Sequence, residues 1–189
     1  MKFRTIVLAL LAVAFISTLF AAEETPSAPP KQIQARGANS FGEETIDSLQ
    51  TTGLVKLNRT VVSQNLSVNG SLIAQGAVIG SIEVMGEAHL TDTVVQRGGT
   101  ILGYLQTHHA TIEQPLVLNG QKAVFTASKL SGITVRQMEA FKGKQIIELR
   151  QKTVVDGPIT FESGKGEVHL DPGCQILGPL KGGKIVKKG

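Results

Sequence analysis

The sequence is short of the residues on which many binding and catalytic sites depend. Cysteine occurs once, at Cys174, so the chain cannot form an internal disulfide bond. Tryptophan is absent and aromatic residues make up 4% of the 189 residues, which leaves few side chains for stacking on nucleic-acid bases. The formal net charge of +4 is small, and Lys2 and Arg4 supply part of it. We therefore expect no nucleic-acid partner, and a fold held together by its core or by partner subunits.

Motifs that carry chemistry are also missing. The sequence has no Gly-x-Ser-x-Gly elbow, no phosphate-binding Walker loop and no His-Glu-x-x-His pair. His108 and His109 are adjacent and would point to opposite faces of a strand, so only stacking of His89 near His108 would bring two imidazoles together. We interpret Glu83 and Glu87, on one outward face, as solvated carboxylates and not as an acid–base pair. The sequence thus predicts no catalytic residue, no metal site, no cofactor and no enzyme activity.

Residues 1–22 have the layout of a secretory signal peptide. Lys2 and Arg4 precede an apolar run from Ile6 to Phe20, and two alanines follow it. Because the run approaches the roughly 18 residues that a spanning helix needs, a retained membrane anchor is the alternative. In both cases we expect the rest of the chain in the periplasm or outside the cell, with the membrane as a partner only if the segment is retained.

Residues 23–50 predict a disordered linker with a short capping helix. Glutamate, proline, serine, alanine and glutamine dominate the composition up to Asn39. Ser40 to Glu43 has the form of a capping box, and Ile46 and Leu49 would lie near one another on the helix that follows. Such a helix would plug the end of a repeat structure, which otherwise exposes unpaired strand edges.

Residues 51–189 contain a repeat. Between Leu66 and Leu90 one nine-residue pattern occurs twice, with apolar or small residues at every second position and glycine in the centre. This alternation is typical of a β-strand. Equivalent glycines recur every 16 or 17 residues, and apolar residues two positions before them recur as well. The glycines are Gly53, Gly70, Gly86, Gly103 and Gly120, and the apolar residues are Val68, Val84, Ile101, Leu118 and then Val135.

A repeat of about 17 residues predicts an all-β fold, a single-stranded parallel β-helix or β-solenoid. Coils of such a fold stack about 4.8 Å apart, so that equivalent residues form columns. We expect about five coils up to Val135, with the Val68 column inside and a second inward column of Leu72, Ala88 and Leu105 that ends at Lys122. The glycine column should mark a corner or a close approach of two backbones.

The C-terminal part departs from this repeat and then acquires one of its own. Residues 121–145 predict an irregular region with strands at Ala123 to Thr126 and Gly132 to Val135 and a helical turn before Gly143. Residues 146–189 hold a second repeat pair, in which Gly157-Pro158 recurs 21 residues later as Gly178-Pro179. We interpret this pair as more of the same wall, with Gly157 and Gly178 at corners.

Two further features have simple structural interpretations. Cys174 follows a Pro-Gly pair and is expected to be a small buried or turn residue, with an intermolecular bridge or a reactive thiol as the alternative. The lysines near the end of the chain are expected to form a solvated tail. They are Lys181, Lys184, Lys187 and Lys188.

The glycine-punctuated run from Val68 to Val84 resembles the bactofilins, the polymer-forming cytoskeletal proteins of bacteria. The resemblance covers about residues 53–135. It implies a right-handed parallel β-helix that polymerises end to end without nucleotide, and it carries over no interface residues.

These observations lead to one functional expectation and two alternatives. We expect an exported, non-enzymatic structural protein of the bacterial cell envelope that associates with itself and forms polymers. The first alternative is a surface module that binds a glycan or a partner envelope protein, for example through a patch centred on Tyr104. The second is an enzyme like the hexapeptide acyltransferases, since Ile73, Ile79 and Met85 fall six residues apart before the series breaks at Thr91.

Overall fold

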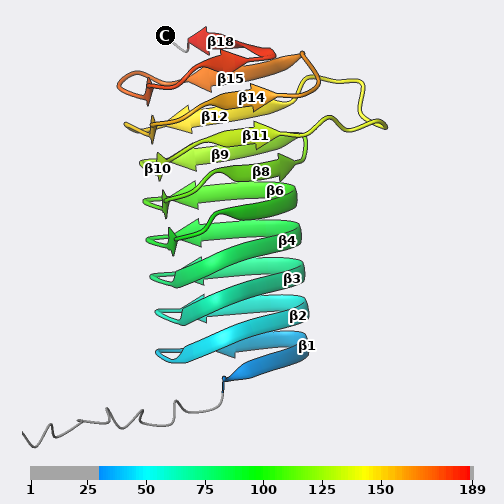
Figure 1. Cartoon of the computed structure of the whole chain (residues 1–189), viewed down its shortest axis with the longest axis vertical. Helices are drawn as coiled ribbons and strands as arrows, with labels where there is room; N and C mark the ends of the chain where they lie inside the picture. Colours follow the sequence, from blue (N-terminus) through cyan, green and yellow to red (C-terminus); the bar gives the residue numbers. More distant parts are fainter. Residues whose placement is uncertain (1–29, 188–189) are drawn as a thin grey trace, which may run out of the picture.

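The computed structural model describes residues 30–187, which form a parallel β-solenoid of about nine turns. All strand pairs are parallel, and the described residues contain no helix. Strands at the front of Figure 1 rise from left to right and return behind, so the solenoid is right-handed. The predicted coils of about 17 residues are confirmed, but the coils number about nine and not five. At about 4.8 Å per coil the rod is about 43 Å long.

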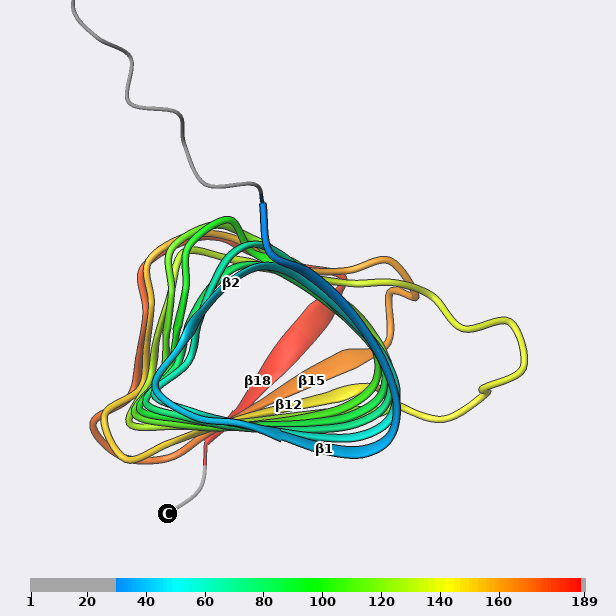
Figure 2. The same ribbon diagram turned by 90° about the horizontal axis from the view of Figure 1, so that it is seen from below.

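Each coil has three faces and three corners, which give the solenoid the triangular outline seen along its axis in Figure 2. The N-terminal coils use long strands that bend at the glycine corner. These are β1 (Gln32–Phe41), β2 (Thr45–Asn58), β3 (Val61–Gln75) and β4 (Val78–Thr91), followed by β5 (Val94–Val95), β6 (Gly99–His108) and β7 (Thr111–Ile112).

The later coils are built from separate short strands, one for each face. They are β8 (Leu116–Asn119), β9 (Lys122–Thr126), β10 (Lys129–Leu130), β11 (Ile133–Val135), β12 (Ile146–Arg150), β13 (Val154–Val155), β14 (Ile159–Phe161), β15 (Gly166–Leu170), β16 (Gln175–Ile176), β17 (Leu180–Lys181) and β18 (Gly183–Lys187). The pairing of β12 with β15 matches Ile147 to Val168 and Leu149 to Leu170, which confirms the offset between the two C-terminal repeats.

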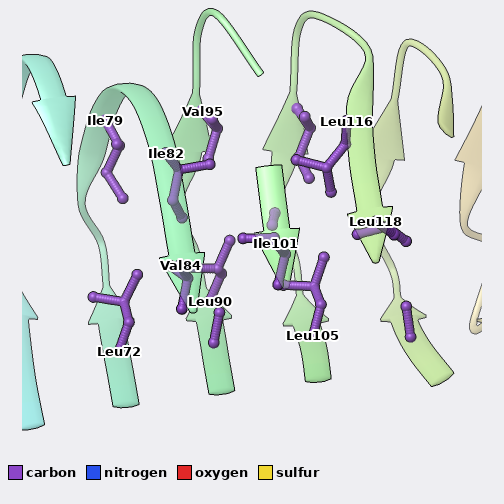
Figure 3. Close-up of a cluster of buried hydrophobic side chains, with 14 of the residues drawn as sticks. Leu72, Ile79, Ile82, Val84, Leu90, Val95, Ile101, Leu105, Leu116 and Leu118 are labelled. Atoms are coloured by element: carbon purple, nitrogen blue, oxygen red, sulfur yellow. The ribbon is translucent and has the colours of Figure 1, made fainter. Parts of the chain in front are cut away.

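The core is a set of inward columns that run along the rod. The register aligns Val68, Val84, Ile101, Leu118 and Val135, as the repeat predicts, and each is at most 5% exposed. In Figure 3 the members Val84, Ile101 and Leu118 lie among other buried aliphatic side chains between the faces. Burying a valine or leucine side chain contributes about 1.5–3 kcal/mol, so the columns supply the main stabilisation.

The second inward column does not end at Lys122. Leu72, Ala88 and Leu105 are followed by Ala123, because Leu105 pairs with Ala123. One extra residue at the corner between Gly120 and β9 shifts the alternation, and it turns Lys122 outward. A strand has a period of two, so a single inserted residue moves every later side chain to the other face.

The predicted capping helix is wrong, and so is the disordered linker for residues 32–50. This segment forms β1 and the start of β2, the first coil of the solenoid. Ile46 and Leu49 are both buried, at 0% and 1% exposure, because a corner lies between them. A corner changes the face, so residues three apart both point inward without forming a helix. The signal or anchor predicted at 1–22 and the linker at 23–29 lie outside the described residues.

The irregular region is shorter than the predicted 121–145. The two expected strands are present within β9 and β11, and only residues 136–145 form a long loop outside the sheet. This loop extends sideways from the solenoid in Figure 2. In place of a helical turn it contains a single turn, closed by the Phe141 amide donating to the Met138 carbonyl at 3.1 Å.

Candidate functional surfaces

The predicted glycine column lies at one corner of the solenoid, where successive backbones touch. The register stacks Gly53, Gly70, Gly86 and Gly103 in line and adds Gly37 below them. A Cβ atom on Gly70 would lie 2.2 Å from the carbonyl oxygen of Gly53, and Gly70 has φ +142. Only glycine combines this φ with such a close approach. The column therefore has a structural role.

The other predicted corner glycines are also close to backbone atoms of the preceding coil. A Cβ on Gly120 would lie 2.0 Å from the Gly103 oxygen, which places Gly120 on the same corner. Gly157 and Gly178 lie at a different corner, where a Cβ on Gly178 would be 2.2 Å from Gly157. The repeat in the sequence thus marks two corners and not one.

The third corner contains a column of small buried residues, several with hydroxyl groups. The Thr153 hydroxyl donates to the Arg150 carbonyl at 2.6 Å and lies 3.1 Å from the Phe125 carbonyl, while Thr93 contacts the Thr91 carbonyl at 2.8 Å. These contacts satisfy backbone groups where the chain turns. The sequence analysis missed this column, which consists of Thr60, Ala77, Thr93, Ala110, Ser128 and Thr153.

Cys174 occupies the next position of this column. It follows the turn at Asp171, whose carbonyl accepts from the Cys174 amide at 3.2 Å, and it packs against the core at intermediate exposure. Its predicted role as a small turn residue agrees with this position.

The histidines and carboxylates singled out in the sequence do not come together. His89 pairs with Gln106 across the sheet, and its ring lies 6.0 Å from that of Tyr104, not beside His108. Glu83 and Glu87 lie on either side of the Gly86 corner, so they are on different faces. Residues 30–187 contain no group of three or more His, Cys, Asp or Glu that could hold a metal ion.

The six-residue series that suggested hexapeptide acyltransferases does not form a column. Ile79 is fully buried, whereas Ile73 is 39% exposed and Met85 54% exposed. The register instead places Ile73 beside His89 and Met85 beside Leu102, on outer surfaces. The resemblance of spacing is therefore not a resemblance of environment.

Tyr104 borders an open groove of about 340 Å³ at the glycine corner. Met138, on the 136–145 loop, lines the other side of this groove. The Tyr104 hydroxyl donates to the Gln106 side chain at 3.3 Å, which fixes the ring against the sheet surface. We call this site the Tyr104 groove; its other lining residues are Gly103, Asn119, Gly120, Gln121 and Lys122.

Two glutamates on the same face carry paired charges although they are largely buried. Desolvation by burial works to raise the pKa of Glu148, but hydrogen bonds from Lys122 and Arg150 outweigh it and hold that pKa below its ordinary value. Glu167 accepts from Lys144 at 2.7 Å and lies 3.2 Å from His169 and 3.4 Å from Lys184. These partners, Lys144 first, lower the pKa of Glu167 to about 2.

The two ends of the described solenoid are open. At the N-terminal end β1 pairs only with β2 among the described strands, and at the other end β18 pairs only with β15. Ile185 is 45% exposed and Leu177 is 66% exposed at the C-terminal end. Neither end has a covering helix within residues 30–187. The described part likewise has no helix of the length and apolarity needed to cross a lipid bilayer.

These features define the class of protein as a parallel β-solenoid repeat protein. Comparisons with protein-family models, with curated proteins and with solved structures return no match. The resemblance to bactofilins therefore depends on the glycine repeat and on the solenoid shape.

Proposed function

We propose that the protein is an exported, non-enzymatic structural element of the cell envelope, which stacks end to end into longer rods. The open ends of the solenoid are the observation that carries the proposal. A strand at the edge of a sheet presents unpaired amide and carbonyl groups, and these are a template for pairing with another chain. Export is part of the proposal because of the signal-like pattern in residues 1–22.

The N-terminal end offers both strand edge and apolar surface. Ile33 and Phe41 point inward but are only partly buried against the core, because no described coil lies below them. Gly37 has φ +80 and nothing within 4 Å of an added Cβ, so its corner is free to receive another coil. A further coil below β1 would bury these groups as each internal coil buries its neighbours.

The C-terminal end has the matching shape. β18 continues the face to which the second half of β1 belongs, since Ile185 lies in the column of Val168 and Ile147. In a head-to-tail stack, Ile185 of one copy would therefore lie beneath Asn39 of the next, and the inward columns would run on through the junction. The sheet twist stays the same across such a junction, because all strands remain parallel.

Charge favours head-to-tail stacking over the two symmetric arrangements. Residues 31–47 at the N-terminal end carry two basic and three acidic residues. Residues 166–187 at the C-terminal end carry three lysines against two carboxylates. Two C-terminal ends would bring lysines together, whereas unlike ends are complementary.

Charged substitutions at the two ends test this arrangement. We expect Ile33→Asp to block the N-terminal end and Ile185→Asp to block the C-terminal end, because each puts a charge into a buried junction. Either variant alone should stay monomeric by multi-angle light scattering. An equimolar mixture should form dimers, since it combines one free end of each kind.

The control lies on the side of the rod. Met85→Asp changes an outward residue in the middle of the solenoid and should leave stacking unchanged. If Ile185→Asp alone formed dimers, stacking would be symmetric. A strict monomer of the unsubstituted protein at every concentration would exclude polymerisation.

A second candidate function is favoured by the Tyr104 groove. An aromatic ring with a nearby apolar side chain and several polar groups is a usual composition for a ligand site. The protein would then be a surface module for a neutral glycan or a peptide of a partner protein. Binding of a chitin pentasaccharide that Tyr104→Ala abolishes and Ile185→Asp leaves intact would support this function; retention of binding in Tyr104→Ala would exclude the groove.

A further inference from the structure

Three consecutive coils carry a Gly-Lys pair at the same corner of the solenoid. The pairs are Gly143-Lys144 in the long loop, Gly164-Lys165 in the turn before β15, and Gly183-Lys184 in β18. In Figure 2 the loop and the turn extend from the same side of the solenoid. Sequence analysis treated the terminal lysines as a solvated tail, but the fold groups Lys184 with lysines from two earlier segments.

These segments enclose a cavity of about 630 Å³, which we call the lysine cleft. Four lysines line it with one carboxylate, so its positive charge is in excess. The lining residues are Lys142, Gly143, Lys144, Gly164, Lys165, Gly166, Glu167, Gly183 and Lys184.

Glu167 holds part of this cleft in place. Its carboxylate is largely buried and contacts the ammonium groups of Lys144 at 2.7 Å and Lys184 at 3.4 Å, while both lysines stay more than half exposed. Lys142 and Lys165 have no ion-pair partner within residues 30–187. The fold therefore concentrates like charges that it does not neutralise, which costs free energy unless an anion binds.

Structural reasons account for the glycines but not for the lysines. A Cβ on Gly166 would lie 2.0 Å from the Phe161 ring, and one on Gly143 would lie 2.5 Å from the Phe141 ring. The glycines are thus required by packing and leave the cleft hollow as a consequence. No comparable contact requires the side chains of Lys142 and Lys165.

We infer that the lysine cleft binds phosphate ester groups carried on an anionic glycan. Lysine ammonium groups act as point charges that suit phosphate oxygens without a fixed angle. The cavity volume is within the range for ligands of several rings or sugar units and exceeds that needed for a single phosphate. No aromatic side chain lines the cleft, so it offers no platform for the bases of a single-stranded nucleic acid.

Calorimetric titration of the full chain with a phosphorylated mannose pentasaccharide tests the inference. Salt at about 0.15 M screens long-range attraction, so only charges near the ligand contribute strongly. We expect binding of the phosphorylated pentasaccharide and none of the neutral mannose pentasaccharide. The double variant Lys142→Ala/Lys165→Ala should weaken binding by about tenfold or more, because each lysine makes a charge-assisted contact.

A matched double variant separates the cleft from overall charge. Lys56→Ala/Lys152→Ala removes the same charge from surfaces outside the cleft and should change affinity less than about twofold. Equal losses in the two double variants would overturn the inference. Tighter binding of a single-stranded oligodeoxynucleotide, binding only to vesicles of anionic lipid, or equal affinity for inorganic phosphate would overturn it as well.

The inference does not depend on stacking of the solenoid ends. Ile33→Asp, which should block stacking at the end farthest from the cleft, is expected to bind the phosphorylated pentasaccharide with unchanged affinity. Loss of glycan binding in the cleft variants and loss of stacking in the end variants are therefore separate results.

Discussion

The N-terminal and C-terminal parts of the solenoid share a core but differ at the glycine corner. Up to Asn119 the chain repeats every 16 or 17 residues, and each corner glycine lies directly on the one before it. Beyond Asn119 the coils become longer. The 136–145 loop and the turn at 162–165 leave the wall at this corner, while the inward column continues through Ala123, Ile147 and Val168.

The difference shows which part of the coil is free to vary. The inward columns must keep their register, because each residue packs against equivalents above and below. Extra residues are accommodated outside the wall, where a loop costs little closure entropy. The candidate binding sites, the Tyr104 groove and the lysine cleft, lie where the regular corner gives way to projecting segments.

The largest expected effect comes from breaking the regular corner. Gly70→Ala places a methyl group against the Gly53 carbonyl oxygen at a φ of +142. We expect the free energy of unfolding to fall by about 3 kcal/mol or more, because both backbone strain and a shift of two coils are required. Urea titration followed by circular dichroism measures this change.

Two control glycines separate clash from strain. Gly42→Ala has neither a positive φ nor an atom within 4 Å, and should be nearly neutral. Gly37→Ala has φ +80 but open space, so it should cost only the conformational term of about 1 kcal/mol. If Gly70→Ala cost no more than Gly37→Ala, the close stacking at this corner would be contradicted.

A smaller effect is expected at the hydroxyl corner, which both parts of the solenoid share. Thr153→Val removes the hydroxyl that contacts the Phe125 and Arg150 carbonyls and the Ser128 amide. We expect a loss of about 1–3 kcal/mol, because buried backbone groups are left unpaired. The control Thr111→Val, on the outward side of β7, should change the unfolding midpoint little.

The smallest effect concerns pH and is confined to the C-terminal part. The pKa of Glu167 falls from an ordinary value of 4.5 to about 2, since Lys144 and His169 stabilise the carboxylate. A lowered folded-state pKa adds stability above pH 4.5 that is lost as the pH falls from 4.5 towards 2. Glu167→Gln should therefore lower the urea midpoint at pH 7 and converge with the unsubstituted protein near pH 2.

The measurement for Glu167 is a series of urea titrations across that pH window. Glu113→Gln removes an exposed carboxylate and serves as the control. A gap between the Glu167→Gln variant and the unsubstituted protein that stayed constant from pH 7 to pH 2 would contradict the pairing of Glu167.

The sequence predicted the fold well where one residue type repeats for one reason. Glycines at 16 or 17 residues and aliphatic residues two positions earlier identified both a corner and an inward column, and the register confirms them. The first coil was missed because Ala35 is a small member of that column and Ile46 and Leu49 mimic a helical spacing across a corner. Stepping sixteen residues back from Gly53 to Gly37 would have found it.

The candidate sites were harder to predict, because they depend on segments that leave the repeat. Tyr104 was noted in the sequence, but its neighbour Met138 belongs to a loop whose direction no periodicity specifies. The three Gly-Lys pairs are visible in the sequence as Gly143, Gly164 and Gly183 with the lysine after each. Their irregular spacing concealed that they share a corner, which follows only from the register of β12, β15 and β18.

The central claim is that the open ends of this solenoid stack head to tail. Cryo-electron microscopy of the purified protein at rising concentration tests it most directly. The account predicts unbranched rods one solenoid wide, with a spacing of about 4.8 Å between coils and an axial repeat of about 43 Å per copy. Particles that remain single short rods at every concentration, or rods in which successive copies point in opposite directions, would contradict it.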